Sequence, residues 1–91
     1  MTYYYPAVIT KKDKDEGYRV DFLDLDQCYG EAKDLEDALE DARYNGVNWI
    51  LTELEDRMEL PAQTHLDDVE LKENQTSTMI ALLMPRDGWD E

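Results

Sequence analysis

The sequence predicts an α+β domain in which one mixed β-sheet carries one main helix packed across it, in the order β-β-β-α-β. Three observations predict this fold: β-forming stretches near the N-terminus, one long segment with helical periodicity, and a short apolar run near the C-terminus. With 91 residues, the chain has room for one compact domain. We therefore expect one domain over residues 1–91, with a polar, loop-rich segment at 62–77 and a tail at 85–91.

Three strands are expected before the helix. Residues 3–10 (YYYPAVIT) are rich in β-forming side chains, and Pro6 within them indicates an edge strand or a bulge. Residues 18–22 alternate apolar and charged side chains, which is typical of a strand with one covered face. After a turn at 24–26, residues 27–31 can form a short third strand.

The clearest element is a helix that begins after Asp34, which can cap it, and ends between residues 55 and 59, before Pro61. Acidic side chains in its first turn suit the positive end of the helix dipole. Apolar or small residues recur at spacings of three and four, and three small ones lie four apart, which lets the helix lie close to a sheet. This face consists of Leu35, Ala38, Leu39, Ala42, Gly46, Trp49, Ile50 and Leu54.

The last predicted element is a strand at residues 78–84 (TMIALLM), a continuous apolar run that stops at Pro85. The run is short for a helix and is typical of a strand buried on both faces. A sheet with a single helix has a second face to cover. We expect Tyr3, Tyr5 and Leu83 to cover it by self-association, in a homodimer or a larger homo-oligomer.

The charge balance limits the possible partners. There are 23 Asp and Glu residues against nine Lys and Arg, for a formal net charge of −14. Phosphate repels such a chain, which disfavours direct binding of nucleic acid or of an anionic membrane. The same charge attracts basic proteins and accelerates encounter with them. The alternative is that the acidity only keeps a small protein soluble, so a second signal is needed.

The cellular compartment follows from what the sequence lacks. Cys28 is the single cysteine, so the chain cannot form an internal disulfide and needs no oxidising compartment. The sequence has neither a long apolar run nor the basic-then-apolar layout of a signal peptide. The cytoplasm is therefore the expected location, and we expect Cys28 to be a small buried core residue.

Five pieces of the sequence form an ordered pattern: YYPAVI at 4–9, Gly17-Tyr18, VDFLDLDQC at 20–28, GEAKDLEDALEDAR at 30–43, and ELP at 59–61. This pattern resembles that of the HicB-like antitoxin family: YPAVI, then GY, then V-x-FPDLPGC, then G-D-T-LEEALENA, then an apolar-proline exit from the helix. The resemblance covers residues 3–61, and the last strand by order alone. The residues that carry it are Tyr5, Pro6, Tyr18, Phe22, Leu25, Cys28, Asp34, Leu35, Ala38 and Ala42.

The resemblance implies a partial RNase-H-like fold and binding to HicA, a small basic toxin that resembles a double-stranded-RNA-binding domain and cleaves mRNA with a histidine. The antitoxin would cover the active face of the toxin, so that inhibition is steric and electrostatic. Two departures from the family stand out. Leu23, Asp26 and Gln27 replace the prolines and the glycine of FPDLPGC, so we expect a different turn. Many members also continue into a DNA-binding domain, for which we expect no room after Pro85, and this puts repression of the chain's own operon in doubt.

The acidic residues allow one enzymatic alternative. Asp21, Asp24, Asp26 and Glu31 invite the idea of a two-metal nuclease, but aspartate is common in turns because its side chain bonds to local backbone. His65 stands alone in a polar segment, where we expect it to be exposed, and no phosphate-cradling glycine loop is present. We therefore predict that the chain is not an enzyme, with no catalytic residue, no metal site and no cofactor.

The densest negative stretch runs from residue 24 to residue 41, with eight acids against one lysine. One interpretation is a solvated surface, and the other is contact with a basic partner. If a basic toxin binds here, its on-rate depends on salt, and Glu36→Lys with Glu40→Lys slows association. The predicted function is thus a HicB-like antitoxin that masks a HicA-like toxin, and the alternative is an orphan acidic HicB-like module with another protein partner. The candidate contact residues are Asp24, Asp26, Glu36, Glu40 and Asp41.

Overall fold

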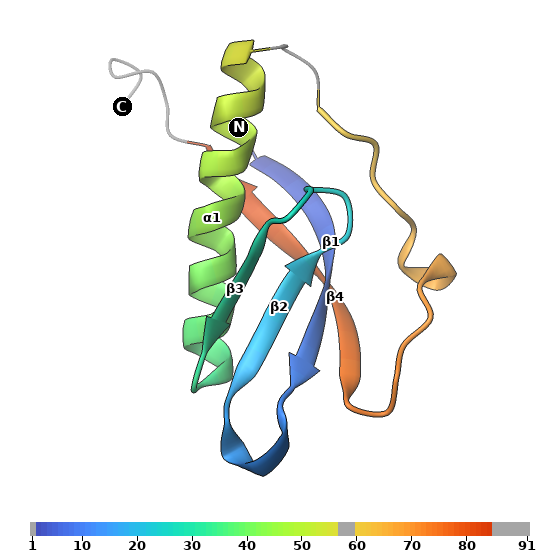
Figure 1. Cartoon of the computed structure of the whole chain (residues 1–91). Coiled ribbons are helices and arrows are strands. Elements are labelled where there is room, and N and C mark those ends of the chain that lie inside the picture. Colours follow the sequence, from blue (N-terminus) through green and yellow to red (C-terminus); the bar gives the residue numbers. More distant parts are fainter. Residues whose placement is uncertain (1, 57–59, 85–91) are drawn as a thin grey trace.

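The computed structural model describes residues 2–56 and 60–84, which form a four-stranded sheet with one long helix on one of its faces (Figure 1). The expected α+β class and the order β-β-β-α-β are confirmed. The tail expected at 85–91 lies outside the described residues. The elements are β1 (Thr2–Lys11), β2 (Tyr18–Phe22), β3 (Tyr29–Ala32), the helix α1 (Leu35–Asp56) and β4 (Gln75–Leu83), with short 3-10 turns η1 (Asp13–Asp15) and η2 (Leu66–Asp68).

The sheet is antiparallel throughout, in the order β3-β2-β1-β4, so the expectation of a mixed sheet is wrong. The reason is the segment 60–74, which lies between α1 and β4 in the sequence. It runs from one end of the sheet to the other (Figure 1). It adds one reversal of chain direction, and β4 therefore runs antiparallel to β1, where a direct connection from α1 would make it parallel. β4 also begins at Gln75, which shortens the loop segment expected at 62–77.

Pro6 lies in an interior strand, and not at the edge or bulge that the sequence indicated, because β1 pairs with β2 on one side and with β4 on the other. The Pro6 carbonyl accepts the N–H of Leu23 at 3.1 Å, just past the end of β2. In a strand, the amide nitrogen and the carbonyl of one residue point to the same side. The missing N–H of Pro6 therefore costs one hydrogen bond at the end of the β1–β2 ladder and none in the β1–β4 ladder.

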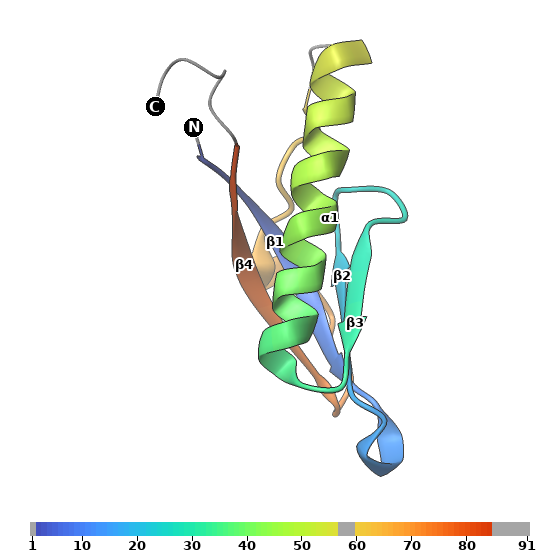
Figure 2. The ribbon, with the colours of Figure 1, turned by 90° about the vertical axis from the view of Figure 1, so that its left-hand side faces the viewer.

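The hydrophobic core lies between α1 and one face of the sheet (Figure 2). Ala38 and Ala42 of the helix are fully buried, as the row of small residues predicted. A Cβ added to Gly30 of β3 would lie only 2.2 Å from the backbone nitrogen of Ala42, so helix and strand meet backbone to backbone. The buried core consists of Tyr5, Ala7, Val20, Phe22, Leu25, Cys28, Ala38, Ala42, Ile50, Ile80 and Leu82.

The N-terminal tyrosines point to opposite faces of the sheet. Tyr5 is buried beneath α1, and Tyr3 packs against the same core, so the expectation that these two cover the opposite face is wrong. Tyr4, one position between them, is 52% exposed on the other face. The physical reason is the period-2 alternation of a strand, which sends every second side chain to the same side.

β4 is an edge strand with one buried face, and not the strand buried on both faces that the apolar run predicted. Ile80 and Leu82 are buried under α1, whereas Met79 and Leu83 are 41% and 65% exposed on the opposite face. Periodicity could not reveal this, because both faces of β4 carry apolar side chains and only one of them is covered.

The turn from β2 to β3 contains a residue with left-handed backbone, Gln27, at a φ of 57°. The N–H of Cys28 closes this turn by donating to the carbonyl of Leu25 at 3.1 Å. Because a left-handed residue interrupts strand pairing, β3 begins at Tyr29 and not at residue 27 as expected. The pattern that the sequence resembles has glycine at this position, and glycine adopts a left-handed conformation without the steric cost that glutamine bears.

Candidate partner-binding groove

A groove of about 1100 Å³ lies along the outer edge of β3, beside residues 41–53 of α1. Its walls come from the helix, the start of β3, the turn before β3, and residues 60–61. Figure 1 shows that this turn lies next to the helix, at the end of the sheet where segment 60–74 begins. The lining residues are Asp26, Gln27, Cys28, Tyr29, Glu31, Asp41, Asn45, Asn48, Trp49, Thr52, Glu53, Leu60 and Pro61.

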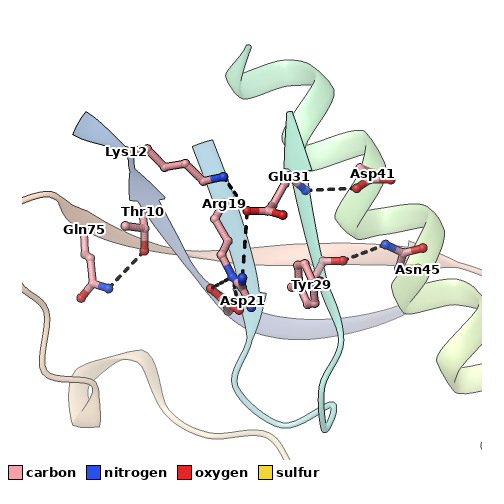
Figure 3. Close-up of polar contacts among 9 residues, drawn as sticks. All are labelled: Thr10, Lys12, Arg19, Asp21, Tyr29, Glu31, Asp41, Asn45 and Gln75. Atoms are coloured by element: carbon pink, nitrogen blue, oxygen red, sulfur yellow. Dashed lines mark hydrogen bonds and ion pairs between the residues drawn. The ribbon is translucent and has the colours of Figure 1, made fainter. Parts of the chain in front are cut away.

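Two side chains of α1 form hydrogen bonds with backbone groups on the outer edge of β3 (Figure 3). The Asp41 carboxylate accepts the backbone N–H of Glu31 at 3.0 Å. The Asn45 side-chain amide donates to the backbone carbonyl of Tyr29 at 2.7 Å. Because these two backbone groups point away from β2, the helix caps the edge that would otherwise be open to another strand.

The indole of Trp49 joins the helix to the turn. Its Nε1–H donates to the backbone carbonyl of Asp26 at 3.0 Å. The ring packs against the core but keeps part of its surface in the groove, while the neighbouring Ile50 is fully buried. Trp49 is therefore a core residue and a wall of the groove at the same time.

Leu60 and Pro61 line the groove, and polar contacts tie Pro61 and the residues that follow it to the rest of the domain. The Tyr5 hydroxyl donates to the backbone carbonyl of Pro61 at 2.7 Å. The Asp24 carboxylate accepts the backbone N–H of Thr64 at 2.8 Å, and the Thr64 hydroxyl as well. Burial, and then the negative charge of Asp24, raise the pKa of Tyr5, so its hydroxyl stays a donor. Asp24 thus anchors the chain three residues after Pro61, the last residue of the groove lining in this segment.

The groove is acidic. Four of its lining side chains are carboxylates, those of Asp26, Glu31, Asp41 and Glu53, and none of the described residues that line it is Lys or Arg. Glu31 forms an ion pair with Lys12 at 2.5 Å, and this hydrogen bond lowers the pKa of Glu31. Carboxylates beside an aromatic ring attract a positively charged side chain, because charge and ring quadrupole act in the same sense.

The structure does not bring the five predicted contact residues onto one surface. Asp26 and Asp41 line the groove, while Asp24 holds residue 64. Glu36 and Glu40 are exposed on α1 outside the groove lining, and Glu40 forms an ion pair with Arg43. Sequence reasoning missed the groove residues Tyr29, Asn45, Asn48, Thr52 and Glu53. The signal that could have found those on α1 is a row that starts at Asp41 and continues in steps of three or four residues through Asn45, Asn48 and Thr52, with Glu53 four residues after Trp49.

The acids weighed as a metal site do not converge. Arg19 donates a hydrogen bond from Nε to the Asp21 carboxylate at 2.9 Å, and this bond raises the pKa of Arg19. The Arg19 guanidinium also lies 3.9 Å from the centre of the Tyr29 ring (Figure 3). In the described ranges 2–56 and 60–84, no cluster of three His, Cys, Asp or Glu side chains is arranged to hold a metal ion. Nor does that part of the chain contain a helix long and apolar enough to cross a membrane.

The remaining candidate side chains lie where the sequence predicted. Cys28 is buried, and burial raises the pKa of its thiol to about 11, so it remains protonated near neutral pH. His65 is exposed, just before η2.

Comparison with known proteins identifies the family. The sequence matches, over residues 5–87, the family described as the HicB_like antitoxin of bacterial toxin-antitoxin system. The chain belongs to the HicB-like antitoxin family.

A solved structure shares the HicB-like fold seen here. It is a toxin-antitoxin complex from Streptococcus pneumoniae, which the HicB-like chain matches with a TM-score of 0.77 and 20% sequence identity, over 89% of this chain and 69% of that chain. No curated protein matches the sequence closely enough to count as a relative. The role of an antitoxin thus rests on the family, and the fold on both findings.

Proposed function

We propose that this HicB-like chain binds and masks a small, basic, HicA-like toxin that cleaves mRNA. The acidic groove beside β3 is the observation that carries the proposal. A protein that binds RNA presents positive charge to the phosphate backbone, and that same surface is complementary to the groove. Masking requires no chemistry on the part of the antitoxin, because a covered RNA-binding surface cannot reach its substrate.

The groove suits a long cationic side chain. The Asp26 carboxylate is exposed at its rim, and the half-buried Trp49 ring and Leu60 supply an apolar wall. An arginine or lysine of the toxin would lay its apolar stem along Trp49 and direct its charged end to Asp26. A guanidinium would bind best, because it pairs with a carboxylate through two parallel hydrogen bonds.

The first experiment tests the partner. The neighbouring reading frames are searched for a small basic protein, which is purified, and cleavage of mRNA by that protein is measured with and without the HicB-like chain. We expect inhibition at a stoichiometric ratio, and an on-rate that falls as salt rises. Growth rescue on co-expression provides the cellular readout. If the chain binds another protein but leaves the ribonuclease active, it is an orphan module and the proposal is wrong.

The second experiment locates the binding surface with two charge reversals of equal size. Asp26→Lys places a positive charge at the groove rim, while Asp67→Lys makes the same change on the exposed η2 turn. We expect Asp26→Lys to weaken binding about tenfold or more, or about 1.4 kcal/mol, and Asp67→Lys to change it little. Glu36→Lys with Glu40→Lys is the competing variant. If it alone weakens binding, the toxin docks on the outer surface of α1.

A further inference from the structure

The outer edge of β4 is the other edge of the sheet, and it is open where that of β3 is capped by α1. Within the described residues, β4 has β1 as its only neighbour, along its full length of nine residues. An edge of this length presents a row of unpaired backbone groups, and proteins usually protect such edges with charges, prolines, bulges or a covering segment.

The pairing with β1 determines which backbone groups of β4 point outward. Pro6 directs its backbone groups towards β2, so its partner Met79 directs its own towards the outer edge, and alternate residues follow the same pattern. In the part of the chain that the structure describes, α1 caps one outward group of β4, the Ala81 carbonyl, which accepts a hydrogen bond from the Arg43 side chain at 3.3 Å. Among the described residues, the Met79 carbonyl has one hydrogen-bond contact, from the Thr78 hydroxyl at 3.5 Å, and that contact is weak.

An apolar patch adjoins this edge on the face opposite α1. Ala81 lies opposite Tyr4 of β1, and Met79 and Leu83 lie two residues on either side of Ala81. Tyr4, Met79 and Leu83 are 52%, 41% and 65% exposed. These side chains share one face and lie within reach of one another, so they form a single patch beside the free edge.

The distribution of charge identifies the occupant. Residues 2–10 and 74–84, which include almost all of β1 and the whole of β4, contain no charged residue in a chain of net charge −14. A basic partner gains no electrostatic attraction at a neutral edge. A second copy of this chain is repelled by every acidic surface, and an uncharged strand pair is where two copies approach at the lowest cost.

We infer that two copies of the chain associate through β4, which pairs antiparallel with the β4 of its copy to form one continuous eight-stranded sheet. The arrangement is isologous, since the same edge serves both subunits about a two-fold axis. The backbone groups of Ser77 and Met79 gain partners, and the Met79 and Leu83 side chains of the two subunits become neighbours. This interface lies two strands away from β3, and therefore leaves the acidic groove of each subunit open.

The test is the molar mass of the purified full chain, measured by sedimentation equilibrium at low and at high salt. We expect a dimer that persists or tightens as salt screens the repulsion between subunits, which is the opposite of the salt response expected for the toxin. A chain that stays monomeric under both conditions would overturn the inference. So would a dimer that salt dissociates.

Three variants locate the interface. Met79→Lys puts a charge at the edge, and Ser77→Pro removes one outward N–H without affecting the β1 ladder. We expect each to weaken dimerisation about tenfold or more. Leu71→Lys is the matched control, because Leu71 is 42% exposed, Met79 is 41% exposed, and the substitution is the same. A dimer that survives both edge variants, or that Leu71→Lys disrupts equally, would place the interface elsewhere. Far-UV circular dichroism checks that each variant is folded.

Discussion

Both edge strands of the sheet have outward backbone groups that pair with no strand within the described residues, and the two edges differ in how far α1 caps these groups. β3 has four residues, lies against α1, and has backbone groups of its outer edge bonded to Asp41 and Asn45. β4 has nine residues, carries no charge, and has a single cap from the helix, through Arg43. The covered edge carries the acidic groove, and the open edge is free to pair. The two partners that we propose, a basic toxin and a second copy of the chain, would therefore bind at opposite edges of the sheet.

The difference arises from where the helix can approach the sheet. Gly30 lets α1 settle directly on β3, because any side chain there would collide with the helix backbone. At β4, the bulkier Ile80 and Leu82 stand between helix and sheet, and only a long arginine side chain reaches the edge. Side-chain size on the inner face of the sheet therefore decides which edge is covered.

The largest expected effect comes from breaking the close contact at β3. In Gly30→Ala, the new methyl group would lie 2.2 Å from the Ala42 nitrogen and 2.6 Å from its Cα, and backbone atoms cannot yield without moving the helix. We expect a loss of about 3 kcal/mol in the free energy of unfolding, measured by urea denaturation.

Gly46→Ala is the matched control for that variant. Its methyl group would meet only the side-chain ends of Leu82 and Phe22, at 2.9 and 3.0 Å, and alanine also favours the helix. We expect a change of less than about 1 kcal/mol. Equal losses in the two variants would show that the backbone contact at Gly30 is not special.

An intermediate effect is expected from uncapping β3. Asp41→Ala and Asn45→Ala each remove one hydrogen bond to the edge, at a cost of about 1 kcal/mol each in the free energy of unfolding. Hydrogen exchange of the Glu31 amide should accelerate in Asp41→Ala and much less in Asp41→Asn, which keeps an acceptor oxygen. If the Glu31 amide exchanges at the same rate in all three proteins, the carboxylate does not cap this edge.

The smallest effect is expected from uncapping β4. Arg43→Ala frees the Ala81 carbonyl and breaks a solvent-exposed ion pair with Glu40, which costs less than about 0.5 kcal/mol of stability. It should strengthen self-association, since one more outward group becomes available. Lys33→Ala makes the same change in charge on an exposed residue and is the control in sedimentation equilibrium. Weaker association in Arg43→Ala than in Lys33→Ala would count against pairing through this part of β4.

Local patterns predicted the elements better than their surroundings. The helix was expected between Asp34 and residues 55–59, and it spans Leu35–Asp56, because a periodic face and a cap are properties of neighbouring residues. The apolar run of β4 was recognised as a strand, but its burial was not, since burial depends on which elements lie above and below it. The prediction of a mixed sheet was wrong for a similar reason. The direction of β4 depends on the path of residues 60–74, and that path leaves no periodic signal in the sequence.

The candidate site was predicted only in part. The density of acids after residue 24 indicated a charged surface, but it did not separate Asp26 and Asp41, which line the groove, from Asp24, which holds Thr64. That distinction depends on a contact across 40 residues of sequence. Trp49 was expected in the core, and its second role in the groove follows from the position of the turn that contains Asp26.

By itself, the sequence determined the α+β class, the long helix with its row of small residues, the excess of negative charge, and the family pattern that the comparison confirmed. Only the tertiary structure decided the strand order, the covered and open edges, and which acids share a groove. The physical reason is range: propensity, periodicity and net charge act through neighbours or through sums, whereas an edge or a groove exists only once distant segments are packed together.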